Sequence, residues 1–101
     1  MINTVALIGR FTADPELRHI PSGVAVTSFT IAVDRSYVKA GEERETDFID
    51  IVAWRHTAEF ICKHFTKGQL IAVEGVLQTR SYEDKTGKRR RVFEVIANNV
   101  H

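Results

Sequence analysis

Four aromatic residues stand out because basic residues accompany them along the sequence. They are Tyr37, Phe48, Trp54 and Tyr82. Tyr37 follows Arg35, and Tyr82 follows Arg80, at a spacing that places ring and cation on one side of an extended chain. Flat rings stack on nucleic-acid bases, because every base has a π-face, and cations meet the phosphates. These residue types are typical of a site that binds single strands without sequence preference.

Two of the rings lie on one predicted strand, residues 46–55. Phe48 and Trp54 have the same parity, so their side chains share a face and stand about 20 Å apart, with Asp50 between them. The opposite face carries the better core residues, Ile49, Ile51 and Ala53. The pattern therefore leaves Phe48 and Trp54 pointing outward, although aromatic residues in strands more often belong to a core.

The candidate phosphate contacts are basic residues at strand ends and in one loop. Those near strand ends are Arg10, Arg18, Arg35, Arg55 and Arg80, and the others form a basic run of Lys85, Lys88, Arg89, Arg90 and Arg91. The net charge is only +1, so total charge indicates no partner, but a local basic cluster can still bind a polyanion. The alternative for the arginine run is a solvated edge that deters strand pairing.

The sequence offers no pattern for catalysis, for a metal or for a cofactor. The histidines at 19, 56, 64 and 101 lack metal-ligand spacing, and Cys62 has no second cysteine with which to pair. Neither a phosphate-binding glycine loop nor a nucleophile with its base can be identified. We therefore expect a protein that is not an enzyme and that needs no metal and no cofactor.

Apolar patterning predicts five strands and one helix. The expected strands cover residues 2–10, 24–35, 46–55, 69–82 and 89–98, and the expected helix covers about 57–66, with Thr57 as its cap and Gly68 just past its end. Residues 84–88, which include Gly87, suit a hairpin turn between the last two strands. This order predicts an all-β OB-fold, a five-stranded Greek-key barrel with one short helix between strands three and four. A mixed α+β sheet is the alternative.

Length and composition predict a single soluble domain over residues 1–101. Hydrophobic residues make up 44% and charged residues 27%, and no apolar run approaches the ~20 residues that span a bilayer, so no membrane partner is expected. The N-terminus lacks the features of a signal peptide, which favours the bacterial cytoplasm. Apolar residues of the first strand fall on both parities, which predicts that a symmetric oligomer covers part of it.

The sequence resembles the bacterial single-stranded DNA-binding protein family over essentially its whole length. The matching segments are NTVALIGR (3–10), DPELR (14–18), PSGVAV (21–26), WR (54–55), KG (67–68), VEG (73–75) and QTRSY (78–82). Each match is weak alone, but their order and spacing together make the resemblance specific. It implies a homotetramer of OB-folds that coats single-stranded DNA, with little sequence preference, during replication, recombination and repair.

The resemblance also implies roles for the four rings. Tyr37, Phe48, Trp54 and Tyr82 stand at the family's base-stacking positions. Three of these positions carry Trp in some members, whereas Trp54 stands where others have Phe. Ring chemistry is thus kept at all four positions, and the resemblance favours stacking over core packing for Phe48.

One departure from the family lies at the C-terminus. Family members usually continue into a flexible linker and an acidic tip that recruits replication and repair proteins, whereas this sequence stops at His101. Such partners are expected only if the full-length protein has that tail. Two other functions stay open: an accessory OB-fold protein of the primosome or of recombination that acts mainly through protein contacts, and a small nuclease. The four rings count against the first, and the missing metal and acid–base residues count against the second.

Overall fold

The computed structural model describes residues 1–36 and 39–101. Its strands are β1 (Val5–Phe11), β2 (Arg18–His19), β3 (Ala25–Asp34), β4 (Thr46–Trp54), β5 (Leu70–Glu83) and β6 (Arg89–Val100), and its helix is α1 (Arg55–His64). The strands and the helix predicted from the sequence are all present, in the predicted order. The short strand β2 is an addition that the sequence pattern did not indicate.

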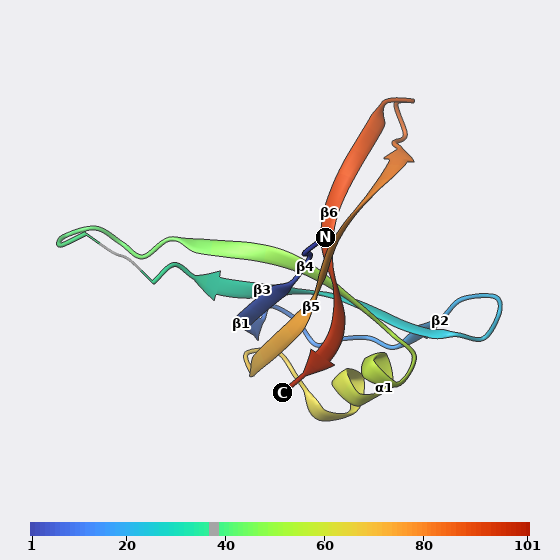
Figure 1. The fold of residues 1–101 in the computed structure, drawn as a ribbon, viewed down its shortest axis with the longest axis horizontal. Coiled ribbons are helices and arrows are strands. Elements are labelled where there is room, and N and C mark those ends of the chain that lie inside the picture. Colours follow the sequence, from blue (N-terminus) through green and yellow to red (C-terminus); the bar gives the residue numbers. More distant parts are fainter. Residues whose placement is uncertain (37–38) are drawn as a thin grey trace.

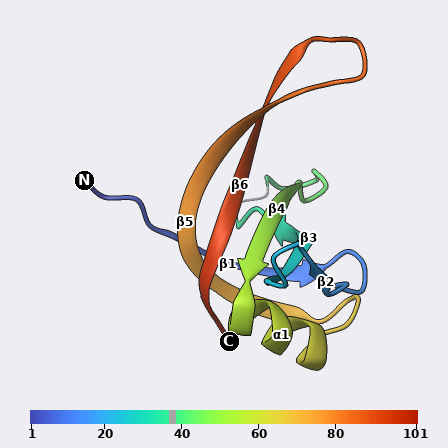
Figure 2. The ribbon, with the colours of Figure 1, turned by 90° about the vertical axis from the view of Figure 1, so that its right-hand side faces the viewer.

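Strand pairing closes the sheet on itself. β1 pairs with β5, β5 with β6, and β4 with β3, all antiparallel, while β4 and β6 pair in parallel. β1 also pairs with β3, which completes the circuit β1–β5–β6–β4–β3. This is the OB-fold topology that the sequence predicted. Figures 1 and 2 show α1 at one end of this body, and Figure 1 shows the β3–β4 and β5–β6 hairpins projecting from it in different directions.

Alternation along each strand sends one set of side chains into the barrel. Ile51 and Ala53 of β4 are fully buried, as their pattern predicted. Phe11 stacks on Phe29 with ring centroids 4.7 Å apart, and Ile61 of α1 is fully buried in the same core. Burial of apolar surface is the dominant favourable term in folding, so this core also fixes which side chains remain on the outer face.

The helix begins and ends earlier than its sequence suggested. It starts at Arg55 directly after β4, and Trp54 occupies the cap position without a side-chain hydrogen bond. Thr57 therefore lies inside the helix, and the last helical residue is His64, well before Gly68. Arg55 turns the chain from strand to helix with a φ of 57°, which is uncommon for a residue with a side chain. This abrupt junction places Trp54 at the exposed end of its strand.

No helix within residues 1–36 and 39–101 is long and apolar enough to cross a membrane.

The pairing of β5 with β6 contains a register shift between Glu74 and Gly75, a β-bulge that leaves little space at Gly75. A Cβ atom added at Gly75 would lie 2.0 Å from the backbone oxygen of Ile96. Only glycine fits there without moving a backbone, so this contact is a steric requirement of barrel closure.

Replacing Gly75 with alanine tests this requirement. We expect Gly75→Ala to lower the free energy of unfolding by about 2–3 kcal/mol, because the added methyl group must push β6 away. Gly87, in the exposed β5–β6 loop at φ 82°, provides the control: Gly87→Asn should cost about 1 kcal/mol or less, because asparagine tolerates that conformation. Urea unfolding of both variants measures the difference, and equal losses would contradict the steric explanation.

Candidate nucleic-acid interface

The outer face of β4 presents two of the predicted aromatic residues to solvent. The Phe48 side chain is 69% exposed and the Trp54 side chain is 40% exposed. Ile51 and Ala53, of opposite parity, lie in the core and Ile49 packs against it, so the alternation of β4 sets both orientations. The predicted outward direction of the two rings is confirmed.

Each of these rings has an arginine in the same row across the sheet. Trp54 lies opposite Val26, which lies opposite Arg18 on β2. Phe48 and Arg10 likewise lie opposite the same residue of β3, one on each side of it. Directly paired residues project from the same face, and neighbouring strands are about 4.8 Å apart, so each arginine begins about 10 Å from its ring. Each ring on β4 therefore has one arginine on the far side of β3.

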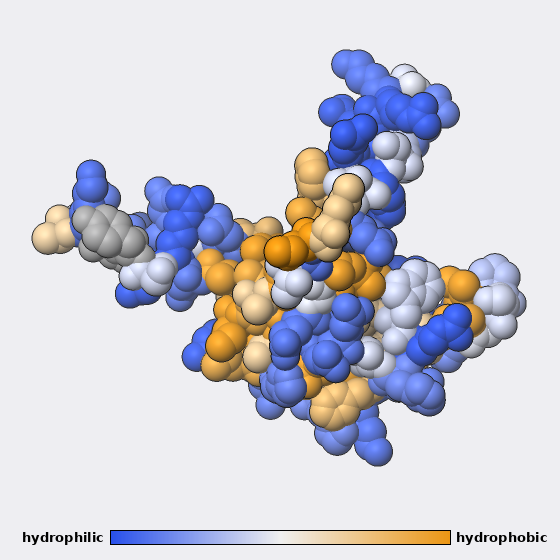
Figure 3. Space-filling view, viewed as in Figure 1, coloured by the Kyte–Doolittle hydropathy of each residue, from blue (hydrophilic) through white to orange (hydrophobic). Residues whose placement is uncertain are grey.

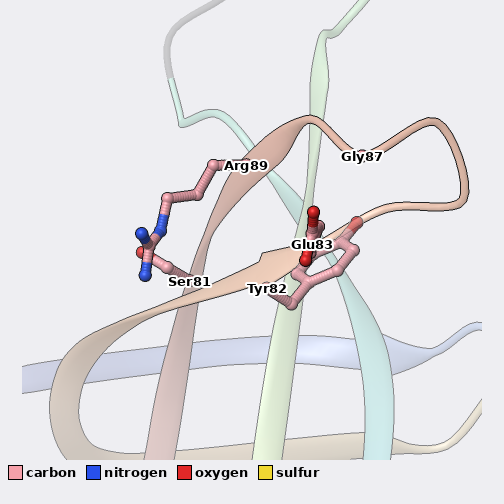
Figure 4. Close-up of a pocket in the computed structure, with 5 residues that line it drawn as sticks. All are labelled: Ser81, Tyr82, Glu83, Gly87 and Arg89. Atoms are coloured by element: carbon pink, nitrogen blue, oxygen red, sulfur yellow. The ribbon is translucent and has the colours of Figure 1, made fainter.

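Tyr82 supplies a third ring, on the β5–β6 hairpin. It is 48% exposed, and the guanidinium carbon of Arg80 lies 5.9 Å from its ring centroid, within the range of a cation–π contact. A hollow of about 370 Å³ adjoins the ring and also reaches Ser81 and Arg89. In Figure 4 the guanidinium group of Arg89 lies beside Ser81, whereas the Tyr82 ring extends to the other side of the hairpin.

The three consecutive arginines of β6 do not act as one cluster. Arg90 lies opposite Tyr82, whereas Arg89 and Arg91 lie opposite Glu83 and Ser81. Because successive side chains of a strand alternate, only Arg90 shares the face of the Tyr82 ring. Arg89 and Arg91 extend from the other face of the hairpin.

A continuous hollow joins Trp54 to the base of the β5–β6 hairpin. It consists of two adjoining parts of about 250 and 200 Å³. Both parts are lined by Ser28, Val52, Arg80 and Glu94. One end reaches Trp54 and Arg18, and the other reaches Thr30 and Asp50. This groove brings residues of β2, β3, β4, β5 and β6 to one surface.

Three of the predicted phosphate contacts already have carboxylate partners. Arg35 forms ion pairs with Glu45 at 2.6 Å and with Asp47 at 3.1 Å. Arg80 pairs with Glu94 at 3.1 Å. The hydrogen bond from Arg35, followed by its charge, holds the pKa of the Asp47 carboxyl below its ordinary value. The positive charge of Arg35 is thus largely compensated before any phosphate arrives.

Asp84 binds the third of these cations, Arg90, and organises the hairpin loop. Its carboxylate accepts hydrogen bonds from the Thr86 hydroxyl at 2.6 Å, the Lys88 backbone N–H at 3.0 Å and Arg90 Nε at 2.8 Å. The Thr86 hydroxyl makes the largest contribution to lowering the pKa of Asp84 to about 2, and Arg90 the next. Asp84 is therefore ionised at neutral pH and holds Arg90 against its own loop.

The remaining predicted phosphate contacts have no carboxylate partner within the described part of the chain. They are Arg10, Arg18, Arg55, Lys85, Lys88, Arg89 and Arg91. Arg18 donates a hydrogen bond to the Ser28 hydroxyl at 3.1 Å, and Arg10 donates one to the Gly68 carbonyl at 3.2 Å. These side chains are exposed, so they are the cations available to an anionic ligand.

Tyr37, the fourth predicted ring, lies outside the described residues. The sequence analysis also missed polar residues that line the groove, namely the hydroxyls of Ser28 and Thr30 and the carboxylate of Glu94. Ser28 and Thr30 alternate with buried residues of β3, a signal that could have placed them on the outer face. Glu94 lacked such a signal, because it reaches the groove only through the pairing of β6 with β5.

Comparison with known proteins agrees with this architecture. The model of the single-strand binding protein family matches residues 2–101. Single-stranded DNA-binding protein 2 of Listeria monocytogenes is 50% identical over 100 residues, which cover 99% of this chain and 62% of that protein. The single-stranded DNA-binding protein of Bacillus cereus is 51% identical over 100 residues, covering 99% and 59%, and that of Streptococcus pneumoniae serotype 4 is 52% identical over 99 residues, covering 98% and 64%.

The chain spans less than two thirds of the length of each of these three relatives. The match to the family model nevertheless extends through every strand of the barrel and through α1. This chain therefore belongs to the single-strand binding protein family.

Proposed function

We propose that residues 1–101 form a domain that binds and coats single-stranded DNA with little sequence preference. The observation that carries the proposal is the set of exposed rings, each accompanied by an arginine, together with a groove lined by Trp54, Arg18 and Arg80. Phe48, Trp54 and Tyr82 would stack on bases, and Tyr37 is proposed for the same role from the sequence alone. Three relatives with about half of their aligned residues identical bear the name single-stranded DNA-binding protein.

Stacking on separated rings explains tolerance of sequence. The six-residue spacing of Phe48 and Trp54 separates the rings by about 20 Å along β4, so they would serve different nucleotides. Each ring accepts any base, because all bases have a π-face. Arg10 and Arg18, in the same rows as the rings, would neutralise the phosphates between stacked bases.

The distribution of hydrophilic and basic side chains suggests where a DNA strand would run after it leaves the groove. Hydrophilic side chains cover much of both projecting hairpins, whereas apolar side chains gather on the body between them (Figure 3). The β5–β6 hairpin carries the cations Lys85, Lys88, Arg89 and Arg91. These residues would hold the phosphate backbone as it leaves the groove. An accessory protein that acts mainly through protein contacts could dispense with the exposed rings, so we favour the coat function.

The proposed setting is the bacterial cytoplasm, where such a coat would protect DNA during replication, recombination and repair. Binding of this kind needs no chemical step and no cofactor. Replication and repair proteins would join the complex only if the full-length protein has an acidic C-terminal tail.

An apolar patch on the outer face of β1 and β5 supports a homo-oligomer, which we propose to be a homotetramer. Ile8 is 61% exposed and lies opposite Ala72, while Leu70 is 52% exposed beside it. A hollow of about 410 Å³ next to this patch is also lined by Glu74 and His101, which pair at 3.0 Å. A second copy of the chain that covered this patch would remove its apolar side chains from water.

The stacking role of Trp54 gives the first test of the function. Trp54→Ala should weaken binding of oligo-dT by about 1–3 kcal/mol, and Trp54→Phe much less, because a π-face remains. The exposed Trp54 ring should cost less stability on truncation than the 3–5 kcal/mol typical of a buried aromatic residue. Phe60 of α1 is 42% exposed, so Phe60→Ala is a control of matched exposure that should leave DNA binding unchanged. A destabilised Trp54→Ala protein that binds at full strength would remove Trp54 from the site.

Salt dependence tests the hairpin cations. Each phosphate neutralised on a single strand contributes about −0.7 to the slope of log K against log salt concentration. The double substitution Arg89→Ala and Arg91→Ala removes both arginines from the hairpin face opposite the Tyr82 ring, and it should reduce the slope by up to about 1.4. The pair Lys63→Ala and Lys67→Ala removes the same charge near α1 and should change the slope little. Equal slopes for the wild type and the arginine variant would show that these arginines do not contact phosphates, and would favour the alternative of a solvated edge.

Sedimentation tests the oligomer. The wild-type chain should sediment as a species about four times its 11.4 kDa mass. Ile8→Glu should dissociate it, because burying an unpaired carboxylate at an interface is unfavourable. Leu17→Glu, in an exposed position of the β1–β2 connection, should leave the assembly intact. A wild-type chain that remains a monomer at micromolar concentration would contradict the proposed assembly.

A further inference from the structure

A carboxylate lies between the proposed stacking rings, where a purely phosphate-binding surface would not place one. Asp50 is exposed on the outer face of β4, between the rows of Phe48 and Trp54 and nearer to that of Phe48. It lines the part of the groove with a volume of about 250 Å³. A negative charge there repels phosphates, so its presence calls for a function other than backbone binding.

A hydrogen bond from the neighbouring strand holds this carboxylate in place. Thr30 lies directly opposite Asp50, and its hydroxyl donates to Asp50 Oδ1 at 2.8 Å. Within the described residues, Asp50 makes no ion pair and no other side-chain hydrogen bond. The carboxylate is thus oriented at one oxygen and keeps acceptor capacity for a ligand in the hollow.

The chemistry of the bases determines what such an acceptor selects. The exocyclic amino group of cytosine donates hydrogen bonds, and aspartate is a typical acceptor for it. Thymine and uracil carry a carbonyl oxygen at that position, which a carboxylate repels. Arg80 lines the same hollow and pairs with Glu94. A guanidinium has five N–H donors, so Arg80 keeps donors for the acceptor atoms on the cytosine edge.

We propose that Asp50 selects the base that occupies this part of the groove, favouring cytosine over thymine and uracil. The proposal rests on the proposed DNA-binding function and adds a preference to it. The rings bind any base by its face, while Asp50 reads the edge of the base between them. Asp50 is therefore a specificity residue in a groove that otherwise tolerates sequence.

The test compares oligo-dC with oligo-dU of the same length, at pH 8 and fixed salt. These bases have the same ring size, and uracil has a carbonyl where cytosine has an amino group. We expect the wild-type chain to bind oligo-dC about three- to tenfold more tightly. In Asp50→Ala the ratio of the affinity for oligo-dC to that for oligo-dU should lose most of this three- to tenfold preference. Asp50→Asn should lower it too, because a rotated amide can donate to the uracil carbonyl. Comparing ratios between variants cancels the intrinsic difference in stacking of the two bases.

A matched carboxylate separates base reading from general charge. Asp34 also lies on the β3–β4 pair, and its carboxylate accepts a hydrogen bond from the opposite Thr46 hydroxyl at 2.8 Å. It lies about 13 Å along β3 from Thr30, beyond reach of the same base. Asp34→Asn removes the same charge and should change binding of both oligonucleotides by one factor, leaving the ratio intact.

Thr30→Val keeps the charge of Asp50 but removes the hydrogen bond that orients it, so the ratio should fall between those of wild type and Asp50→Ala. The inference is overturned if Asp50→Ala and Asp50→Asn strengthen binding of both oligonucleotides equally, because Asp50 then acts only by repulsion. Failure of the wild-type chain to bind either oligonucleotide would instead overturn the proposed DNA-binding function, and the inference with it.

Discussion

The alternation of side chains along β4 is the constraint on which the proposed interface depends. Ile51 and Ala53 fill the barrel, so their neighbours Phe48, Asp50 and Trp54 must project outward. A shift of one residue in the pairing of β3 with β4 would bury the rings and expose the core residues. The packing that stabilises the barrel therefore also exposes the face that we propose for DNA binding.

Barrel closure then decides which side chains meet that face. Pairing of β6 with both β4 and β5 brings Arg80 and Glu94 beside residues of β3 and β4 to form one groove. The close approach of β5 and β6 at Gly75 is part of this closure. Ion pairs divide the cations into two classes, because Arg35 and Arg80 hold carboxylates while Arg10 and Arg18 have none among the described residues. The groove thus combines the exposed ring of Trp54, the cation Arg18 and one oriented acceptor, Asp50.

The sequence was sufficient to predict the barrel and the outward direction of the rings, because both follow from local period-two patterning. It misplaced the start of α1, since the cap signal of Thr57 was overridden by the turn at Arg55 that joins β4 directly to the helix. The ion pair between Arg35 and Asp47 could not be predicted from the sequence pattern, because it depends on the register between two strands. Thr30 and Asp50 meet for the same reason, because the register between the consecutive strands β3 and β4 places them opposite each other.

The fluorescence of Trp54 tests the central claim most directly, because Trp54 is the sole tryptophan of the chain. The wild-type protein would be titrated with a labelled oligo-dT, while the label's anisotropy and the tryptophan emission are recorded on the same samples. Stacking of a base on the indole predicts strong quenching that saturates together with the rise in anisotropy. A rise in anisotropy with unchanged tryptophan emission would show that DNA binds elsewhere, and it would contradict the account of β4 as the stacking surface.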